Sequence, residues 1–244
     1  MRGASHLAIV KLAASVMPTE YSGFLSRLQE GIKEGASLTD EFRWYWEMDD
    51  GNVGRRIRMH RCYMDSDDHR DHGCPVQIVR YATGIPGLLE GWVDGTLADL
   101  YDDDELFFLN AGSYFGIVSH HIADLCTPVH VGHAVHPTVF GYRSRAGLHS
   151  RVEADLDRAA ASIDSLQPFT PQPNLPTVQT LESVASKIYR DFYLRMASVY
   201  RPLQPAPVRA AFFSGCIVAA AKLTAEIWLG ILTSTDPQAL STWC

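Results

Sequence analysis

Apolar residues recur at helical spacing along most of this 244-residue chain, and no segment alternates convincingly between apolar and polar residues as a half-buried strand would. Gly35 stands where one of these helical segments is expected to end. We therefore expect an all-α fold, and the length favours a single compact multi-helix domain over residues 1–244. The pattern predicts helices over residues 5–17, 24–35, 105–126, 148–166, 178–200 and 206–233.

Two segments interrupt the helical pattern. Residues 45–80 are polar, irregular and rich in glycine and aspartate, so they are predicted to form a long loop region. Residues 167–177 contain prolines at 168, 171, 173 and 176, which cannot continue a helix. This second segment is predicted to be a loop that links two helices.

Two apolar runs invite comparison with targeting or membrane segments. The run near the N-terminus is interrupted by Lys11 and lacks a clear cleavage site, so we expect a helix of the folded domain. The run over 208–233 contains Lys222 and Glu226, which favours a core helix over a membrane span. A cytoplasmic protein without a transmembrane segment is therefore predicted.

Composition excludes several classes of protein. The chain is 46% hydrophobic and 20% charged, which is typical of globular proteins. Its net charge of -7 argues against a broad basic surface that would grip duplex DNA or an anionic membrane. The five cysteines are widely spaced and form no CxxC pair, which excludes a zinc ribbon and a dense disulfide scaffold.

The most informative segment is S-H-H-I-A-D-L-C-T-P-V-H over residues 119–130. His120 and Asp124 are four residues apart, so they share one face of a helix, and Pro128 ends that helix just before His130. A second pair at the same spacing, His149 and Glu153, follows. Imidazole and carboxylate are typical ligands of first-row metals, and the absence of cysteine at these ligand positions favours zinc over an iron–sulfur cluster. A metal would also compensate the cost of burying Asp124 in an apolar helix.

These motifs resemble those of the zinc-dependent phospholipase C and single-strand-specific nuclease superfamily. The core motif H-x3-D-x5-H, with proline two residues before the last histidine, and the following H-x3-E motif are both present. Upstream, A-S-L-T-D-E-F-R over 36–43 is similar to a helix-end motif of the nucleases. The resemblance covers roughly residues 1–155. The residues that carry it are His6, Asp40, His60, His120, Asp124, Pro128, His130, His149 and Glu153.

The resemblance implies three metal positions and two to three Zn²⁺ ions per chain, with iron or manganese as possible replacements. It also implies that a free α-amino group is a ligand. The family places a Trp at that terminus and this chain has Met1, which is a departure. The implied ligand sets are Asp40, His60, His120 and Asp124 for the first metal, Met1, His6 and Asp124 for the second, and His130, His149 and Glu153 for the third.

Several roles stay open at this point. Asp40 is a candidate catalytic residue that could orient or deprotonate the attacking water instead of ligating tightly. His69 and His72 compete with His60 for its ligand position. Four further residues are candidates for substrate binding, against the alternatives of core packing or solvent exposure. They are Trp44, Arg58, His133 and His136.

The expected activity is phosphoester or phosphodiester hydrolysis, in which metal-activated water attacks phosphorus. Glu153 favours the phospholipase branch and the 36–43 motif favours the nuclease branch. One alternative is an intracellular biosynthetic enzyme that uses the same metal centre on one small metabolite, for elimination, cyclisation or hydrolysis of a non-phosphate bond. A second alternative is a non-catalytic protein that retains metal for stability.

Overall fold

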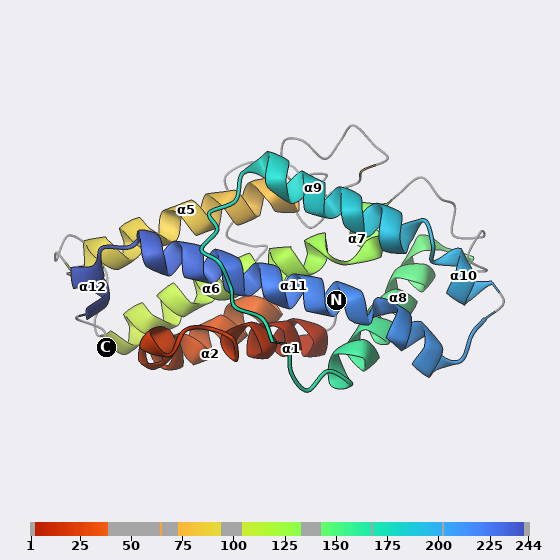
Figure 1. Ribbon diagram of the computed structural model, residues 1–244, viewed down its shortest axis with the longest axis horizontal. Helices are drawn as coiled ribbons and strands as arrows, with labels where there is room; N and C mark the ends of the chain where they lie inside the picture. The colour runs from red at the N-terminus through yellow and green to blue at the C-terminus, as the bar shows by residue number, and fades with distance from the viewer. Residues whose placement is uncertain are drawn as a thin grey trace.

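The computed structural model describes residues 3–38, 64, 73–93, 104–132, 143–166, 168–201 and 203–241, and all elements in these ranges are helical. The expected all-α class is confirmed. The helices run mostly along the long axis of the molecule (Figure 1). They are α1 (Gly3–Ala14), η1 (Thr19–Tyr21), α2 (Ser22–Leu38), α5 (Cys74–Val93), α6 (Asp104–Leu125), α7 (Pro128–Val131), α8 (Arg145–Ala161), α9 (Val178–Ile188), η6 (Tyr189–Tyr193, a π-helical turn), α10 (Ala197–Tyr200), α11 (Ala206–Ser234) and α12 (Pro237–Ser241).

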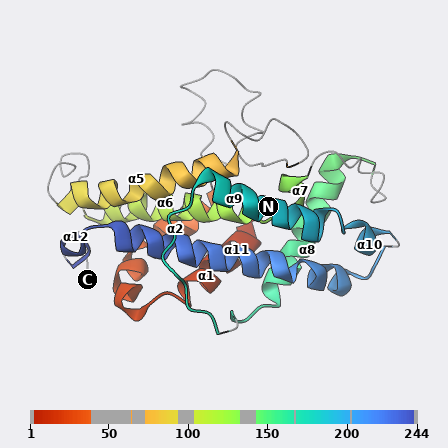
Figure 2. The same cartoon turned by 45° about the horizontal axis from the view of Figure 1, so that its top comes forward.

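Helix α11 runs through the middle of the bundle, with α5 and α9 on one side and α1 and α2 on the other (Figures 1 and 2). Its length and apolar composition would suffice to cross a membrane, but 72% of its most apolar window is buried inside the molecule. Phe213 and Trp228 are fully buried, and Trp228 meets Phe115 of α6 edge-on. This burial agrees with the prediction of a core helix.

Helices α2 and α6 approach each other more closely than side chains would allow, because glycines line both sides of the contact. A Cβ atom at Gly31 or Gly35 of α2 would overlap the carbonyl oxygen of Leu109 or Ser113. Glycines 112 and 116 of α6 are equally tight against the α2 backbone. Two G-x3-G pairs therefore face each other, a pattern that lets helix backbones meet.

The expectation that a helix ends at Gly35 is wrong. Helix α2 continues to Leu38, and Gly35 lies within the contact with α6, where its missing side chain is needed for packing.

The predicted loop 45–80 extends too far, because residues 74–80 belong to α5. In that helix Cys74, Ile78, Ile85 and Leu89 recur at helical spacing and are buried. Pro75 stands in the first turn, where a missing N–H costs nothing. The helix expected over 178–200 is interrupted instead: α9 changes into the π-turn η6 before the short α10.

The proline-rich segment crosses the outside of α11 as an extended strap (Figure 1). The Asn174 N–H donates to the Glu226 carbonyl at 3.1 Å, and Gly230 lies directly beneath the Asn174 backbone. A side chain at Gly230 would collide with the strap.

A buried ion pair joins α8 to α11. Asp155 of α8 accepts hydrogen bonds from Arg209 Nε at 2.7 Å and from the Tyr200 hydroxyl at 2.9 Å. The Arg209 side chain also donates to the Gln204 carbonyl, so the turn before α11 is tied to the same network. This network sets the position of α8, the helix that carries His149 and Glu153.

Candidate metal centre

Six of the predicted metal ligands come together where four helices meet. His6 comes from α1, His120 and Asp124 from the C-terminal half of α6, and His130 from the short α7. Helix α8 supplies His149 and Glu153. They form two groups, each with ligand atoms within 4.8 Å of one another. The first ligand group is His6, His120 and Asp124, and the second ligand group is His130, His149 and Glu153.

The Asp124 carboxylate connects the two groups. Its Oδ2 lies 3.3 Å from His120 Nε2, while its Oδ1 lies 4.0 Å from His6 Nε2. The same Oδ1 is 3.3 Å from His130 Nδ1 of the second group. Burial alone would raise the pKa of Asp124, but the neighbouring His130 and His120 outweigh burial and hold that pKa well below its ordinary value. Asp124 is therefore an ionised carboxylate inside the protein.

The His6 side chain is buried, and no hydrogen bond among the described residues uses the lone pair of its ring. Neither of its ring nitrogens makes a hydrogen bond within the described part of the chain, and its ring stacks on His120 at 4.2 Å between centroids. Burial, and then the proximity of His120, lower the pKa of His6 well below its ordinary value. A neutral, buried imidazole beside a carboxylate is the chemical form in which histidine binds a metal.

The close contact between α2 and α6 determines how His120 is oriented. His120 Nδ1 lies 3.1 Å from the carbonyl oxygen of Ala36, one residue after Gly35. Because a carbonyl can only accept, this contact requires a proton on Nδ1 and turns Nε2 toward Asp124. Metal-bound histidines are commonly held by a backbone carbonyl in this way.

The second ligand group is more open than the first. His149 Nδ1 lies 3.1 Å from Glu153 Oε1, and the His149 side chain is 28% exposed. His149 Nε2 also lies 2.7 Å from Nε2 of His130, and the two rings stack. Three donor atoms therefore converge from α7 and α8 beside the first ligand group.

Local sequence explains the position of His130. Helix α6 ends at Leu125, and Pro128 begins the four-residue helix α7. The His130 N–H donates to the Thr127 carbonyl at 2.9 Å, and Gly132 follows against the ring of Tyr193 in η6. The tight turn brings His130 back toward the helix that carries Asp124.

Sequence reasoning missed one contact near the first ligand group. Asp157 is one turn after Glu153 on α8, and its Oδ1 accepts the Ser5 N–H at 3.1 Å. It thereby satisfies an N–H in the first turn of α1, next to His6. The i, i+4 series His149, Glu153, Asp157 was visible in the sequence, but its partner on α1 was not.

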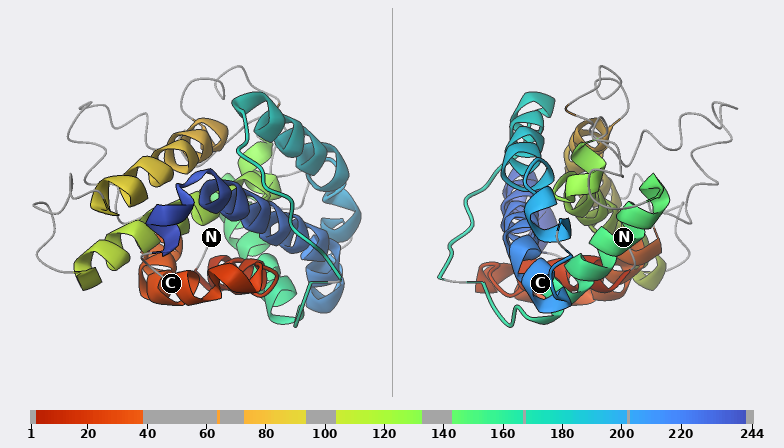
Figure 3. Two further views of the ribbon diagram at one scale, coloured as in Figure 1. Left: turned by 60° about the vertical axis from the view of Figure 1, so that its left-hand side comes forward. Right: turned by 90° about the vertical axis from the view of Figure 1, so that its right-hand side faces the viewer.

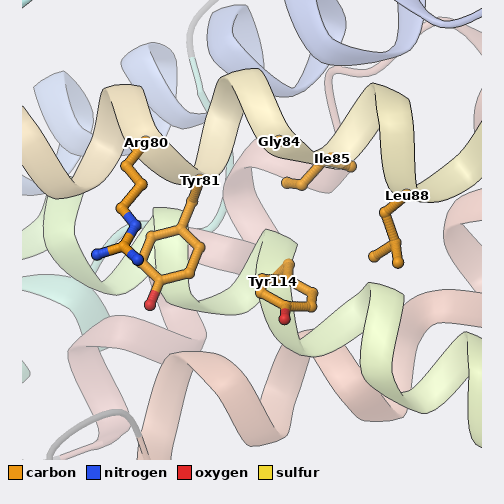
Figure 4. Close-up of a pocket in the computed structure, with 6 residues that line it drawn as sticks. All are labelled: Arg80, Tyr81, Gly84, Ile85, Leu88 and Tyr114. Atoms are coloured by element: carbon orange, nitrogen blue, oxygen red, sulfur yellow. The ribbon is translucent and has the colours of Figure 1, made fainter. Parts of the chain in front are cut away.

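A cavity of about 330 Å³ lies between α5 and α6, separate from the ligand groups (Figure 4). Tyr81 lines it, and burial raises the pKa of this phenol well above its ordinary value. The Tyr81 ring also stacks on His121, which meets His120 edge-on. The His121 ring therefore lies between this cavity and the first ligand group.

The remaining predicted site residues lie outside the described residues. This applies to the proposed ligands Met1, Asp40 and His60, and to the competing His69 and His72. It also applies to the candidate substrate-binding residues Trp44, Arg58, His133 and His136. Their roles stay predictions.

No protein-family model matches this chain, and no curated protein matches it significantly. The function must therefore be inferred from the residues and their arrangement. That arrangement defines an all-helical protein with two adjoining histidine–carboxylate groups that could hold metal ions.

Proposed function

We propose that the chain is a multinuclear zinc-dependent phosphoester hydrolase of the phospholipase C and nuclease type. One observation carries the proposal: the buried carboxylate of Asp124 lies within 4.0 Å of three imidazoles that come from three different helices. A buried carboxylate needs charge compensation, and imidazole and carboxylate groups that converge on one point are suited to bind a cation that supplies it.

The donor set fits zinc. Imidazole nitrogen and carboxylate oxygen are both zinc ligands, and the described residues of the two groups contain no thiolate. His6, His120 and Asp124 would hold metal in the first ligand group, and His130, His149 and Glu153 in the second. Bound zinc ions would lower the pKa of a water molecule to near neutrality and stabilise negative charge on the phosphoryl oxygens.

The protein's own groups prepare the site for this chemistry. Asp124 stays ionised, so its two oxygens can serve both ligand groups without releasing a proton first. The Ala36 carbonyl accepts a hydrogen bond from His120 Nδ1 and so orients this ring, and burial favours the neutral form of the stacked His6 ring. The partly exposed His149 makes the second group the more accessible to solvent, where a substrate phosphate can reach it. Asp40, which lies outside the described residues, is the proposed residue for orienting or deprotonating the water.

The test combines metal analysis with a generic phosphodiester. The purified protein should contain two to three equivalents of zinc by mass spectrometry and should hydrolyse bis-p-nitrophenyl phosphate. A chelator should abolish turnover and zinc should restore it. Asp124→Asn should lose both metal and turnover, whereas Asp164→Asn, which changes an exposed aspartate beyond α8, should lose neither.

Two results would reject the proposal. Turnover that persists after complete metal removal would exclude a metal-dependent hydrolase. Full metal occupancy without hydrolysis of any phosphomonoester or phosphodiester would leave the metal groups intact but would assign them to a different reaction or to a structural role.

A further inference from the structure

The most exposed large apolar side chains of the described residues lie close together in the chain. Leu194 is 51% exposed, Leu203 is 65% exposed and Val208 is 47% exposed. They occupy the segment from the end of η6 to the first turn of α11. This segment turns around at one end of the molecule, which faces the viewer in the right-hand view of Figure 3. We call these three residues the apolar tip.

The tip projects from an ordered scaffold. On the other side of the same segment, Tyr193, Met196 and Tyr200 are buried. The Gln204 N–H donates to the Val199 carbonyl at 3.0 Å, and Tyr200 is held by Asp155. Pro205 further restricts the backbone just before α11. These contacts hold the backbone of the segment that carries the two leucines, whose side chains are exposed.

The charges around the tip are positive, although the chain as a whole carries -7. Residues 189–208 contain three arginines and a single aspartate. Arg190, Arg195 and Arg201 are all exposed, and none forms an ion pair with another described residue. The aspartate, Asp191, is paired with Lys187 at 2.5 Å. The net charge of the chain argues against a broad basic surface, but it is compatible with this local group of arginines.

Protruding leucines and valine among arginines are suited to an anionic lipid surface. Apolar side chains enter the boundary between headgroups and acyl chains, while arginines remain at the phosphate level. A protein partner is less well suited, because three side chains on a turn fall far short of the roughly 800 Å² that each side of a stable protein interface buries. We propose that the apolar tip and its three arginines form a docking surface for anionic lipid membranes.

The tip lies at the same end of the molecule as the second ligand group. Tyr193 of η6 packs against Gly132, which immediately follows the helix that carries His130. Helices α7, α8 and α10 appear together at this end in Figure 1. Docking would bring the partly exposed His149 toward the membrane. The docking proposal itself does not depend on the proposed hydrolase activity.

Co-sedimentation with vesicles tests the proposal without any need for turnover. The protein should bind vesicles of phosphatidylcholine and phosphatidylserine at low salt, and much less to phosphatidylcholine alone. Leu194→Asp with Leu203→Asp should weaken binding by at least about tenfold, because each leucine loses its apolar contribution. Replacement of Arg190, Arg195 and Arg201 by glutamate should cost at least about fivefold per residue and should remove the attraction that low salt strengthens.

Matched controls change exposed residues elsewhere. Leu175→Asp on the strap removes a leucine that is 44% exposed, and Lys11→Glu on α1 reverses a single exposed charge, as each arginine change does. Both controls should bind vesicles like the parent protein. The proposal is overturned if the parent protein does not sediment with anionic vesicles, or if the control variants lose binding equally. It is also overturned if the parent is a dimer in solution that Leu194→Asp with Leu203→Asp converts to a monomer, because the tip would then bind a second copy of the chain.

Discussion

The first ligand group joins α1 to α6, two helices far apart in the chain, whereas two of the three side chains of the second group lie one turn apart on α8. The first group is fully buried and depends on backbone contact between α2 and α6. The second is partly open to solvent and depends mostly on the spacing within a single helix. The first ligand group therefore forms only in the complete fold. In the second group, the residue spacing of the single helix α8 places two of the three ligands.

The largest effect on metal binding should come from removing the carboxylate of Asp124, which contacts both ligand groups. We expect Asp124→Asn to weaken metal binding at the first group by more than about a hundredfold, since even loss of an outer partner of a ligand costs about 10–100-fold. It should also weaken the second group, because Asp124 contacts His130. Glu153→Gln should affect the second group alone. Isothermal titration with zinc measures both, and equal loss in both variants would contradict this division.

A methyl group at the α2–α6 contact should have the next largest effect. In Gly116→Ala the new Cβ would overlap the Ile32 carbonyl and crowd the Ala36 nitrogen. We expect a loss of about 3 kcal/mol in the free energy of unfolding, measured by urea denaturation, together with weaker metal binding at the first group. Gly87→Ala on α5 is the control, because its Cβ would meet no atom within 4 Å. It should stabilise the helix by about 0.5–1 kcal/mol; a similar loss in both variants would refute the packing argument.

The same contrast between the two ligand groups explains which features of the site could be predicted from the sequence. Pairs such as His120 and Asp124 are recognisable because their spacing is that of one helix turn. The contact between the Ala36 carbonyl and His120 could not be predicted, because every residue has a carbonyl. Only the close approach of α2 and α6 at the glycines brings this carbonyl to His120. Both G-x3-G motifs can be seen in the sequence. The sequence does not show that they contact each other, because they lie far apart in the chain. The π-turn η6 likewise interrupts a helical pattern that gave no local sign of a break.

Burial of His6 should make the stability of the metal-free protein depend on pH. The folded-state pKa of His6 lies below its unfolded value near 6.5, so the unfolded chain takes up a proton first as the pH falls. His6 therefore costs stability below about pH 6.5, by up to about 1.4 kcal/mol per pH unit until the folded-state pKa is reached. Urea unfolding between pH 8 and 5 should give a shallower loss for His6→Phe than for the parent protein. Parallel curves would show that His6 is not the titrating group.

The smallest effect is expected at the contact that anchors α1 to α8. Asp157→Ala removes the acceptor for the Ser5 N–H, which should cost about 1 kcal/mol, as the loss of a helix cap does. Because the affected turn contains His6, zinc affinity at the first ligand group should fall while the second group keeps its affinity. Hydrogen exchange at the Ser5 amide provides a readout that is independent of metal and should become faster. Asp157→Asn should restore most of the protection, because its amide oxygen still accepts; if it behaves like alanine, the carboxylate acts through charge and not as a cap.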